Sequence, residues 1–202
     1  MYFKEQRYEK AKSSTLAATH TVELPESGIL DSISMYFRST NANGQTTLPG
    51  NQHHHITKIE VIGDNDKTLF SMSAEQTLAK AYRKMGALPA FKQNEYNSQS
   101  QDMLIPLFFG RHYRDPLYAL DLSAWDKVEL QVTNNFVTTT ITDSLSMETR
   151  LCTQEEAGAI PSKLLKQWQY DSRAPTAAGQ YLNVKMPTKG KLRTLMIQLD
   201  PV

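Results

Sequence analysis

Short segments of alternating polar and apolar residues, separated by turn residues, constrain the fold of this 202-residue chain more than any other feature. Clear examples are residues 19–24, 56–63 and 127–133, and Pro25 and Gly28 close the first of them. Alternation places successive side chains on opposite faces of a strand, so each segment has one face to bury. Further candidate strands cover residues 29–38, 67–72, 103–109, 144–152, 164–170, 179–185 and 192–199. About ten short strands with regularly spaced turns are typical of an all-β sandwich or barrel.

One segment predicts a helix instead, at residues 73–85. Ser73 can cap its N-terminus, with Gln76 three residues later as a capping box requires. Gly86 is suited to end it in a left-handed conformation. Four residues recur at helical spacing and predict one apolar face: Leu78, Ala81, Tyr82 and Met85.

Composition excludes several classes of protein. Hydrophobic residues make up 40% of the chain, which is enough for a core, and the net charge of +1 argues against a binder that relies on a basic face for nucleic acid. The single cysteine, Cys152, excludes an internal disulfide and a zinc site built from several thiolates, and we expect it to be buried. No apolar stretch is long enough for a membrane helix, and the N-terminus lacks the apolar region of a secretory signal. We therefore expect a soluble protein made in a reducing compartment.

Three consecutive histidines, His53, His54 and His55, form the most conspicuous cluster of possible metal ligands. On a strand, His53 and His55 would share a face and could bind one ion, whereas His54 could not. The cluster ends a predicted loop of residues 39–55, which is long for a compact domain and therefore functional or mobile. We interpret it as a solvated polar loop in preference to a native metal site.

Other chemically suggestive residues have simpler interpretations. Residues 64–66 (Asp-Asn-Asp) resemble the start of a calcium loop but lack its later ligands, so we predict a hairpin turn. Glu155 and Glu156 are adjacent in a predicted loop and are expected to be solvated. Trp125 and Trp168 could form a sugar-stacking platform, but core or interface roles fit their wide separation better. We assign no catalytic residues, no metal ligands, no cofactor-binding residues and no cofactor.

Two stretches resemble a known family. Residues 21–33 (TVELPESGILDSI) and 105–132 (IPLFFGRHYRDPLYALDLSAWDKVELQV) are similar to the first barrel of double jelly-roll major capsid proteins. These proteins build tailless, membrane-containing icosahedral viruses, a group that includes the phages PRD1 and PM2. The segment 56–63 followed by the predicted helix also fits. The resemblance covers residues 18–134 and is weaker beyond residue 135.

The resemblance implies an all-β jelly-roll fold with a particular domain organisation. Residues 1–15 would be an N-terminal arm beneath the barrels, near an internal membrane. Residues 16–135 would form a complete first jelly roll containing the helix at residues 73–85. Residues 136–202 would begin a second jelly roll that is present only in part, because two barrels need about 16 strands. Either the sequence is a fragment, which we prefer, or a partner completes the second sheet.

The resemblance also implies a function without enzymatic activity. The protein would be a structural virion protein of a bacteriophage or related virus, made in the host cytoplasm, that trimerises and tiles an icosahedral shell. Its partners would be its own copies in neighbouring capsomers, minor capsid proteins and the internal viral membrane, and no specific nucleic acid. Three alternatives remain open: a carbohydrate-binding jelly-roll module, a single jelly-roll penton or spike protein, and a cupin-type metalloenzyme that uses residues 53–55.

Within this scheme we expect the segment Gly110–Tyr118 to have a structural role, fixing a barrel corner or forming a trimer contact. Arg111 and Asp115 are its central residues. The aromatic and arginine residues that suit buried protein–protein contacts are Phe108, Arg111, Tyr113, Arg114 and Tyr118.

Overall fold

The computed structural model describes residues 2–14, 17–41, 52–87, 89, 91–92, 99–115, 117–137, 145–155, 164, 166–168, 192 and 195–197. The chain divides into two units, Met1–Trp168 and Gln169–Val202. Only four residues of the second unit are described, and all four are exposed. The architecture below is therefore that of the first unit.

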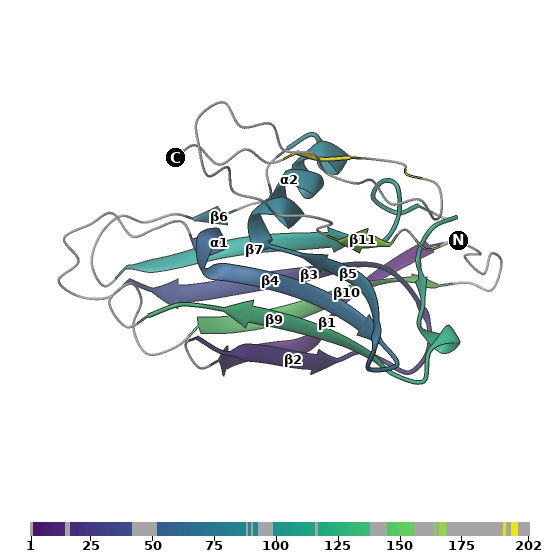
Figure 1. Ribbon diagram of the computed structural model, residues 1–202, viewed down its shortest axis with the longest axis horizontal. Helices are drawn as coiled ribbons and strands as arrows, with labels where there is room; N and C mark the ends of the chain where they lie inside the picture. Colours follow the sequence, from purple (N-terminus) through teal and green to yellow (C-terminus); the bar gives the residue numbers. More distant parts are fainter. Residues whose placement is uncertain are drawn as a thin grey trace, which may run out of the picture. The chain divides into compact units, whose positions relative to one another are not determined.

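Two sheets account for the strands of the first unit (Figure 1). The six-stranded sheet contains β1 (Tyr2–Ser14), β10 (Leu145–Glu155), β3 (Ile29–Thr40), β7 (Ser100–Phe108) and β6 (Phe91–Lys92) in that order, with β8 (Leu120–Asp121) also paired to β3. The five-stranded sheet has the order β11 (Gln167–Trp168), β5 (Lys67–Met72), β4 (Ile56–Gly63), β9 (Val128–Asn134) and β2 (Thr19–Glu23). All strand pairs are antiparallel except β11 with β5.

The order of the strands is that of a jelly roll. Apart from the short strands β6, β8 and β11, eight strands remain, arranged as β1-β10-β3-β7 and β2-β9-β4-β5. Except at the β4–β5 hairpin, each of these strands is followed by one in the other sheet. Eight antiparallel strands in two sheets with this alternation form a jelly roll, so the predicted all-β jelly-roll class is confirmed.

The core lies between the two sheets and follows the alternation seen in the sequence. In β3, the side chains of Ile33, Met35 and Phe37 are 0% exposed. The facing sheet contributes a second set of buried side chains, which includes Ile59, Val61, Leu130 and Val132. Strand β3 and the central strands of the facing sheet thus each bury one face, as period-two patterning requires.

The expected N-terminal arm is wrong for residues 2–14, which form strand β1. This strand pairs with β10 from Tyr2 opposite Glu155 to Ser14 opposite Leu145. It is an edge strand whose Lys4, Arg7 and Lys10 side chains are exposed, and Arg7 pairs with Glu148 of the neighbouring strand at 2.8 Å. Edge strands tolerate such charges, which is why the sequence of β1 lacks a clear apolar face.

The expected boundary of the first barrel at residue 135 also needs correction. Its eighth strand is β10, so the barrel runs from residue 2 to residue 155 instead of from 16 to 135. Strand β10 is central to the sheet, and its Met147 and Leu151 enter the core. Of the expected second jelly roll, residues 169–202 lie almost entirely outside the described residues, and that part stays a prediction.

Helix α2 (Ala74–Met85) confirms the helix predicted from the sequence. Ser73 and Gln76 form the capping box, and Gly86 ends the helix with φ of 71°. The helix packs beside β7 (Figure 1). Leu78 and Ala81 of the expected apolar face are buried, whereas Tyr82 and Met85 are exposed. Among the described residues, no helix has the length and apolar character needed to cross a membrane.

Strand β11 pairs with β5 and is also tied to the barrel by one of its side chains. The buried Gln167 amide donates a hydrogen bond to the carbonyl oxygen of Phe108 at 2.8 Å and accepts one from the ammonium group of Lys80. Burial lowers the pKa of Lys80 to about 8. Of the strand expected at residues 164–170, the described part contains Gln167 and Trp168.

We expect Leu151→Ala to lower the free energy of unfolding by about 2–5 kcal/mol, because Leu151 is fully buried and its removal leaves a cavity. The exposed Leu195 provides a matched control, and Leu195→Ala should change it by less than about 0.5 kcal/mol. Urea denaturation followed by circular dichroism measures both. Equal, small effects would mean that β10 is not part of the core.

Candidate functional site

The segment between β7 and β9 forms a corner built around the carboxylate of Asp115. Asp115 is 0% exposed, and its oxygens accept hydrogen bonds from the Arg111 guanidinium at 2.6 and 2.9 Å. They also accept the backbone N–H groups of Arg111 at 2.9 Å and Leu117 at 3.0 Å. The guanidinium and these amides hold the pKa of Asp115 well below its usual range. The arrangement is a buried, fully bonded carboxylate that fixes the path of the chain.

Neighbouring elements are tied to this corner. The amide of Gln154 in β10 donates to the backbone oxygen of Asp115 at 3.0 Å, and the ammonium group of Lys84 in α2 donates to the backbone oxygen of Gly110. Gly110 permits the close approach, because a Cβ there would lie 2.5 Å from the Cβ of Asp115. The expected corner-fixing role of Gly110–Tyr118 therefore agrees with the geometry.

A second buried carboxylate, Asp31 in β3, lies beside the corner and was not singled out from the sequence. It is 1% exposed, and its Oδ2 accepts the backbone N–H of Arg114 at 3.2 Å. Within the described part of the chain, its Oδ1 has no hydrogen-bond partner. Burial raises the pKa of Asp31 to about 6, although hydrogen bonds from the backbone of Arg114 and Asp115 act in the opposite direction. The only available signal was an acid within a segment otherwise patterned as a buried strand.

The aromatic and arginine residues of the corner divide between inner and outer positions. Arg111 stacks on the Tyr118 ring at 4.6 Å while it binds Asp115. Arg114 lies over the rings of Tyr113 at 5.0 Å and Phe3 at 5.6 Å, so it reaches across to strand β1. Tyr113 and Leu117 are 41% and 54% exposed. The corner thus presents an apolar and cationic outer surface above a braced interior.

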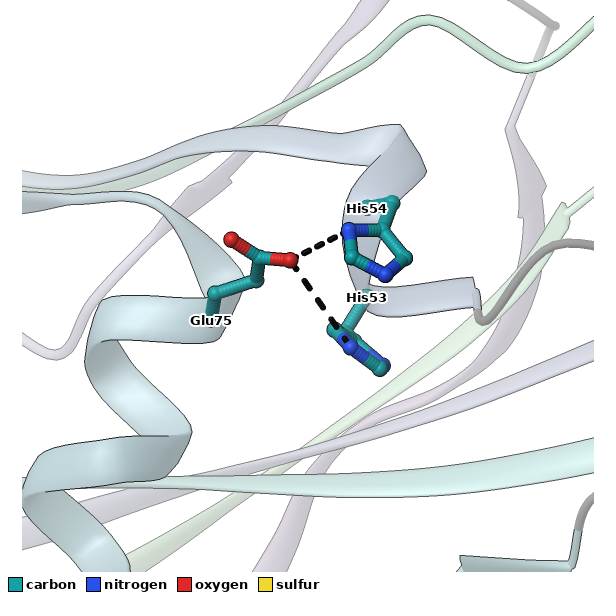
Figure 2. Close-up of side chains that lie close together, drawn as sticks. All are labelled: His53, His54 and Glu75. Atoms are coloured by element: carbon teal, nitrogen blue, oxygen red, sulfur yellow. Dashed lines mark ion pairs between the residues drawn. The ribbon is translucent and has the colours of Figure 1, made fainter. Parts of the chain in front are cut away.

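At the other end of the strands, two of the three histidines meet a glutamate (Figure 2). Residues 52–55 form the short helix α1 (Gln52–His55), and His53, His54 and Glu75 place one ligand atom each within 4.8 Å of one another. The Nδ1 atom of His54 contacts Glu75 Oε1, and the Nε2 atom of His53 lies 3.9 Å from the same oxygen. Burial lowers the pKa of His53, and the neighbouring His54 adds to this effect.

The strand geometry that would have placed His53 and His55 on one face is wrong, because residues 52–55 form a helical turn, and the expected loop is helical at its end. Because α1 is a helical turn and not a strand, neighbouring side chains are about 100° apart instead of opposite. His55 faces elsewhere, stacks on Phe136 at 4.9 Å and approaches the Asn135 amide oxygen at 3.2 Å.

The remaining candidates are dispersed. Asp64 and Asn65 have φ of 50° and 65°, and Asp64 pairs with Lys67 at 2.8 Å, which confirms the predicted hairpin turn. Cys152 is buried as expected, and burial raises the pKa of its thiol. Trp125 is partly buried against the core. The side chains of Glu155 and Trp168, and the whole of Glu156, lie outside the described residues.

Comparison with known proteins supports the fold. No family model matches the sequence, and no curated protein matches it. The major capsid protein of Sulfolobus turreted icosahedral virus superposes with a TM-score of 0.61 at 13% identity, over 76% of this chain and 49% of that one. The capsid of the virus PBCV-1 superposes with a TM-score of 0.53 at 13% identity, over 75% of this chain and 42% of that one. The major capsid protein of bacteriophage PM2 superposes with a TM-score of 0.51 at 12% identity, over 80% of this chain and 53% of that one.

These solved structures are double jelly-roll viral capsid proteins, so the expected resemblance is confirmed as a shared fold. The chain spans about half the length of the proteins that it matches. The jelly roll of this chain therefore superposes on about half of each of those proteins.

We expect Asp115→Ala to lower the free energy of unfolding by about 2–4 kcal/mol, because it leaves the amides of Arg111 and Leu117 without their acceptor and removes the carboxylate that the partly exposed Arg111 guanidinium binds. Asp121→Ala is the matched control. Asp121 accepts one exposed hydrogen bond, from the Ser123 N–H, so its loss should cost about 1 kcal/mol. Chemical denaturation of the dilute chain separates the two, and equal losses would contradict the corner's role.

We expect Asp31→Asn to stabilise the protein relative to the wild type increasingly as the pH rises from about 4 to 7. The pKa of Asp31 is about 6 in the folded chain and near 3.8 when unfolded. Folding therefore favours the protonated carboxyl, and this stabilisation is fully present below pH 3.8. It is lost as the pH rises through 6, which lowers the free energy of unfolding of the wild type by at most about 3 kcal/mol.

The test is urea denaturation of wild type and variant at several pH values. Asp66→Asn, in the exposed β4–β5 turn, should follow the wild type throughout. A difference between wild type and Asp31→Asn that does not change with pH would contradict the raised pKa.

Proposed function

We propose that this chain is a capsid protein whose copies assemble as trimers into an icosahedral virus shell. The observation that carries the proposal is the complete β1-β10-β3-β7 and β2-β9-β4-β5 jelly roll, which superposes on viral major capsid proteins. The protein's place is then the virion. Its partners are its own copies, neighbouring capsomers and minor capsid proteins, and it acts through shape without enzymatic activity.

The shape of the barrel supports a building role. Both sheets are packed against each other, and the corner segment is braced from β10 and α2, so its outer surface has a fixed form. On that surface Tyr113, Arg114 and Leu117 lie close in sequence and are exposed. Tyrosine and arginine are enriched where protein interfaces bind most strongly. We place a contact between copies at this corner.

The expected contact between the N-terminal segment and a viral membrane depended on residues 1–15 forming a free arm. Residues 2–14 are engaged along β10, so they form part of the barrel wall. We therefore leave the membrane out of the proposed set of partners.

Sedimentation of the purified 202-residue chain, with negative-stain electron microscopy, tests the assembly. We expect a mass of three copies and an outline with three-fold symmetry. A stable monomer at high concentration would overturn the proposal. A five-copy ring would overturn the trimer in favour of a penton or spike protein.

We expect Leu117→Glu to weaken self-association at least about tenfold, which corresponds to roughly 1.4 kcal/mol, because a charge would be buried at the contact. Val137→Glu is the matched control. Val137 is 47% exposed and follows β9, at the opposite end of the strands. Sedimentation over a concentration series compares them. Equal association of both variants and the wild type would show that the corner is not the contact.

A further inference from the structure

We propose that His53, His54 and Glu75 form a zinc site that joins helix α1 to the first turn of helix α2. The ligand atoms are His53 Nε2, His54 Nδ1 and Glu75 Oε1. All the residues belong to one copy of the chain, so the site does not rest on the proposed function.

The geometry fits an ion of this class. Tetrahedral Zn²⁺ with bonds of about 2.0–2.1 Å holds its ligand atoms roughly 3.3 Å apart. The 3.9 Å between His53 Nε2 and Glu75 Oε1 is close to that value, and His54 Nδ1 already contacts the same oxygen. Figure 2 shows both imidazoles directed toward the carboxylate. An ion between them would replace the direct contact between His54 and Glu75 with bonds from both groups to the metal.

The donor set favours zinc over the abundant hard cations. Two imidazole nitrogens and one carboxylate oxygen suit Zn²⁺ and related transition metals, whereas Mg²⁺ and Ca²⁺ prefer oxygen ligands. Three protein ligands leave a fourth position for water. His54 is the most exposed ligand, with 55% of its side chain accessible, whereas His53 and Glu75 are 20% and 29% accessible. An ion can therefore reach the site from solvent.

The scaffold holds each ligand in place. Glu75 is in the first turn of α2, which the reciprocal hydrogen bonds of Ser73 and Gln76 fix. The turn of α1 is anchored through His55, which stacks on Phe136. Each ligand thus projects from a held backbone, as a specific site requires.

The site would join two long connections that emerge at the same end of the barrel. Residues 41–55 link β3 to β4, and residues 73–99 link β5 to β7. They meet again where the backbone N–H of Asn41 donates to the carbonyl oxygen of Gln99 at 3.0 Å. A metal ion that binds both connections only in the folded chain stabilises the folded state.

The experiment titrates metal-free protein with Zn²⁺ after treatment with a chelator. Calorimetry gives the stoichiometry and affinity, thermal unfolding gives the stabilisation, and Co²⁺ absorption reports the coordination geometry. The ligand variants are His54→Ala and Glu75→Gln. Matched controls are His112→Ala and Glu26→Gln, because both residues are exposed and outside the cluster.

We expect one Zn²⁺ per chain, a rise in melting temperature on addition of Zn²⁺, and no comparable rise with Mg²⁺ or Ca²⁺. Each ligand variant should lose at least about tenfold in Zn²⁺ affinity, and both controls should bind like the wild type. Because binding is compared within each variant, a change in its metal-free stability does not affect the result. Absence of binding at micromolar Zn²⁺, or equal affinity in all variants, would overturn the site and leave an ion pair between His54 and Glu75.

Discussion

The pairing of strand β3 on both sides is the constraint on which the rest of the barrel depends. It is paired with β10 along one edge and with β7 along the other, and β8 pairs at its start. Its inward side chains, Ile33, Met35 and Phe37, are fully buried, and each contributes roughly 1.5–3 kcal/mol. A shift of one residue would turn all three to the outer face. Packing against the second sheet thus fixes the register of β3, of its neighbours, and through β10 of the edge strand β1.

The sequence predicted the strands that have one apolar and one polar face. It did not predict strand β1, which lacks this difference between its faces. Strands β4 and β9 alternate clearly because one side meets the core and the other meets solvent. Strand β1 is exposed at Lys4, Arg7 and Lys10, and its hydrogen bonds to β10 determine its structure more than a buried face does. Backbone pairing with a strand about 140 residues away leaves no local pattern in the sequence. The sequence therefore predicts a polar arm in place of β1 and an end of the barrel before β10.

The same distinction between local and distant interactions explains which site residues could be predicted from the sequence. The capping box joins Ser73 and Gln76, three positions apart, and could be predicted, and Arg111 and Asp115 are close enough in sequence to suggest a unit. The burial of Asp31 against the corner, and the meeting of His54 with Glu75, depend on how separate elements cross. For the histidines the error began with the assumption of a strand, since the choice of helix or strand decides which side chains share a face.

The two ends of the barrel differ in what they can tolerate. At one end, the buried carboxylates of Asp31 and Asp115 bind backbone amides, so an insertion or a shift there would leave charged oxygens unpaired in the interior. At the other end, the long connections leave strands whose pairing is already secure, at Thr40 opposite Ser100. Loop-closure entropy rises only slowly with length, so these connections can grow or change at little cost to the fold. In the proposed assembly, contacts between identical copies are therefore best placed at the braced end.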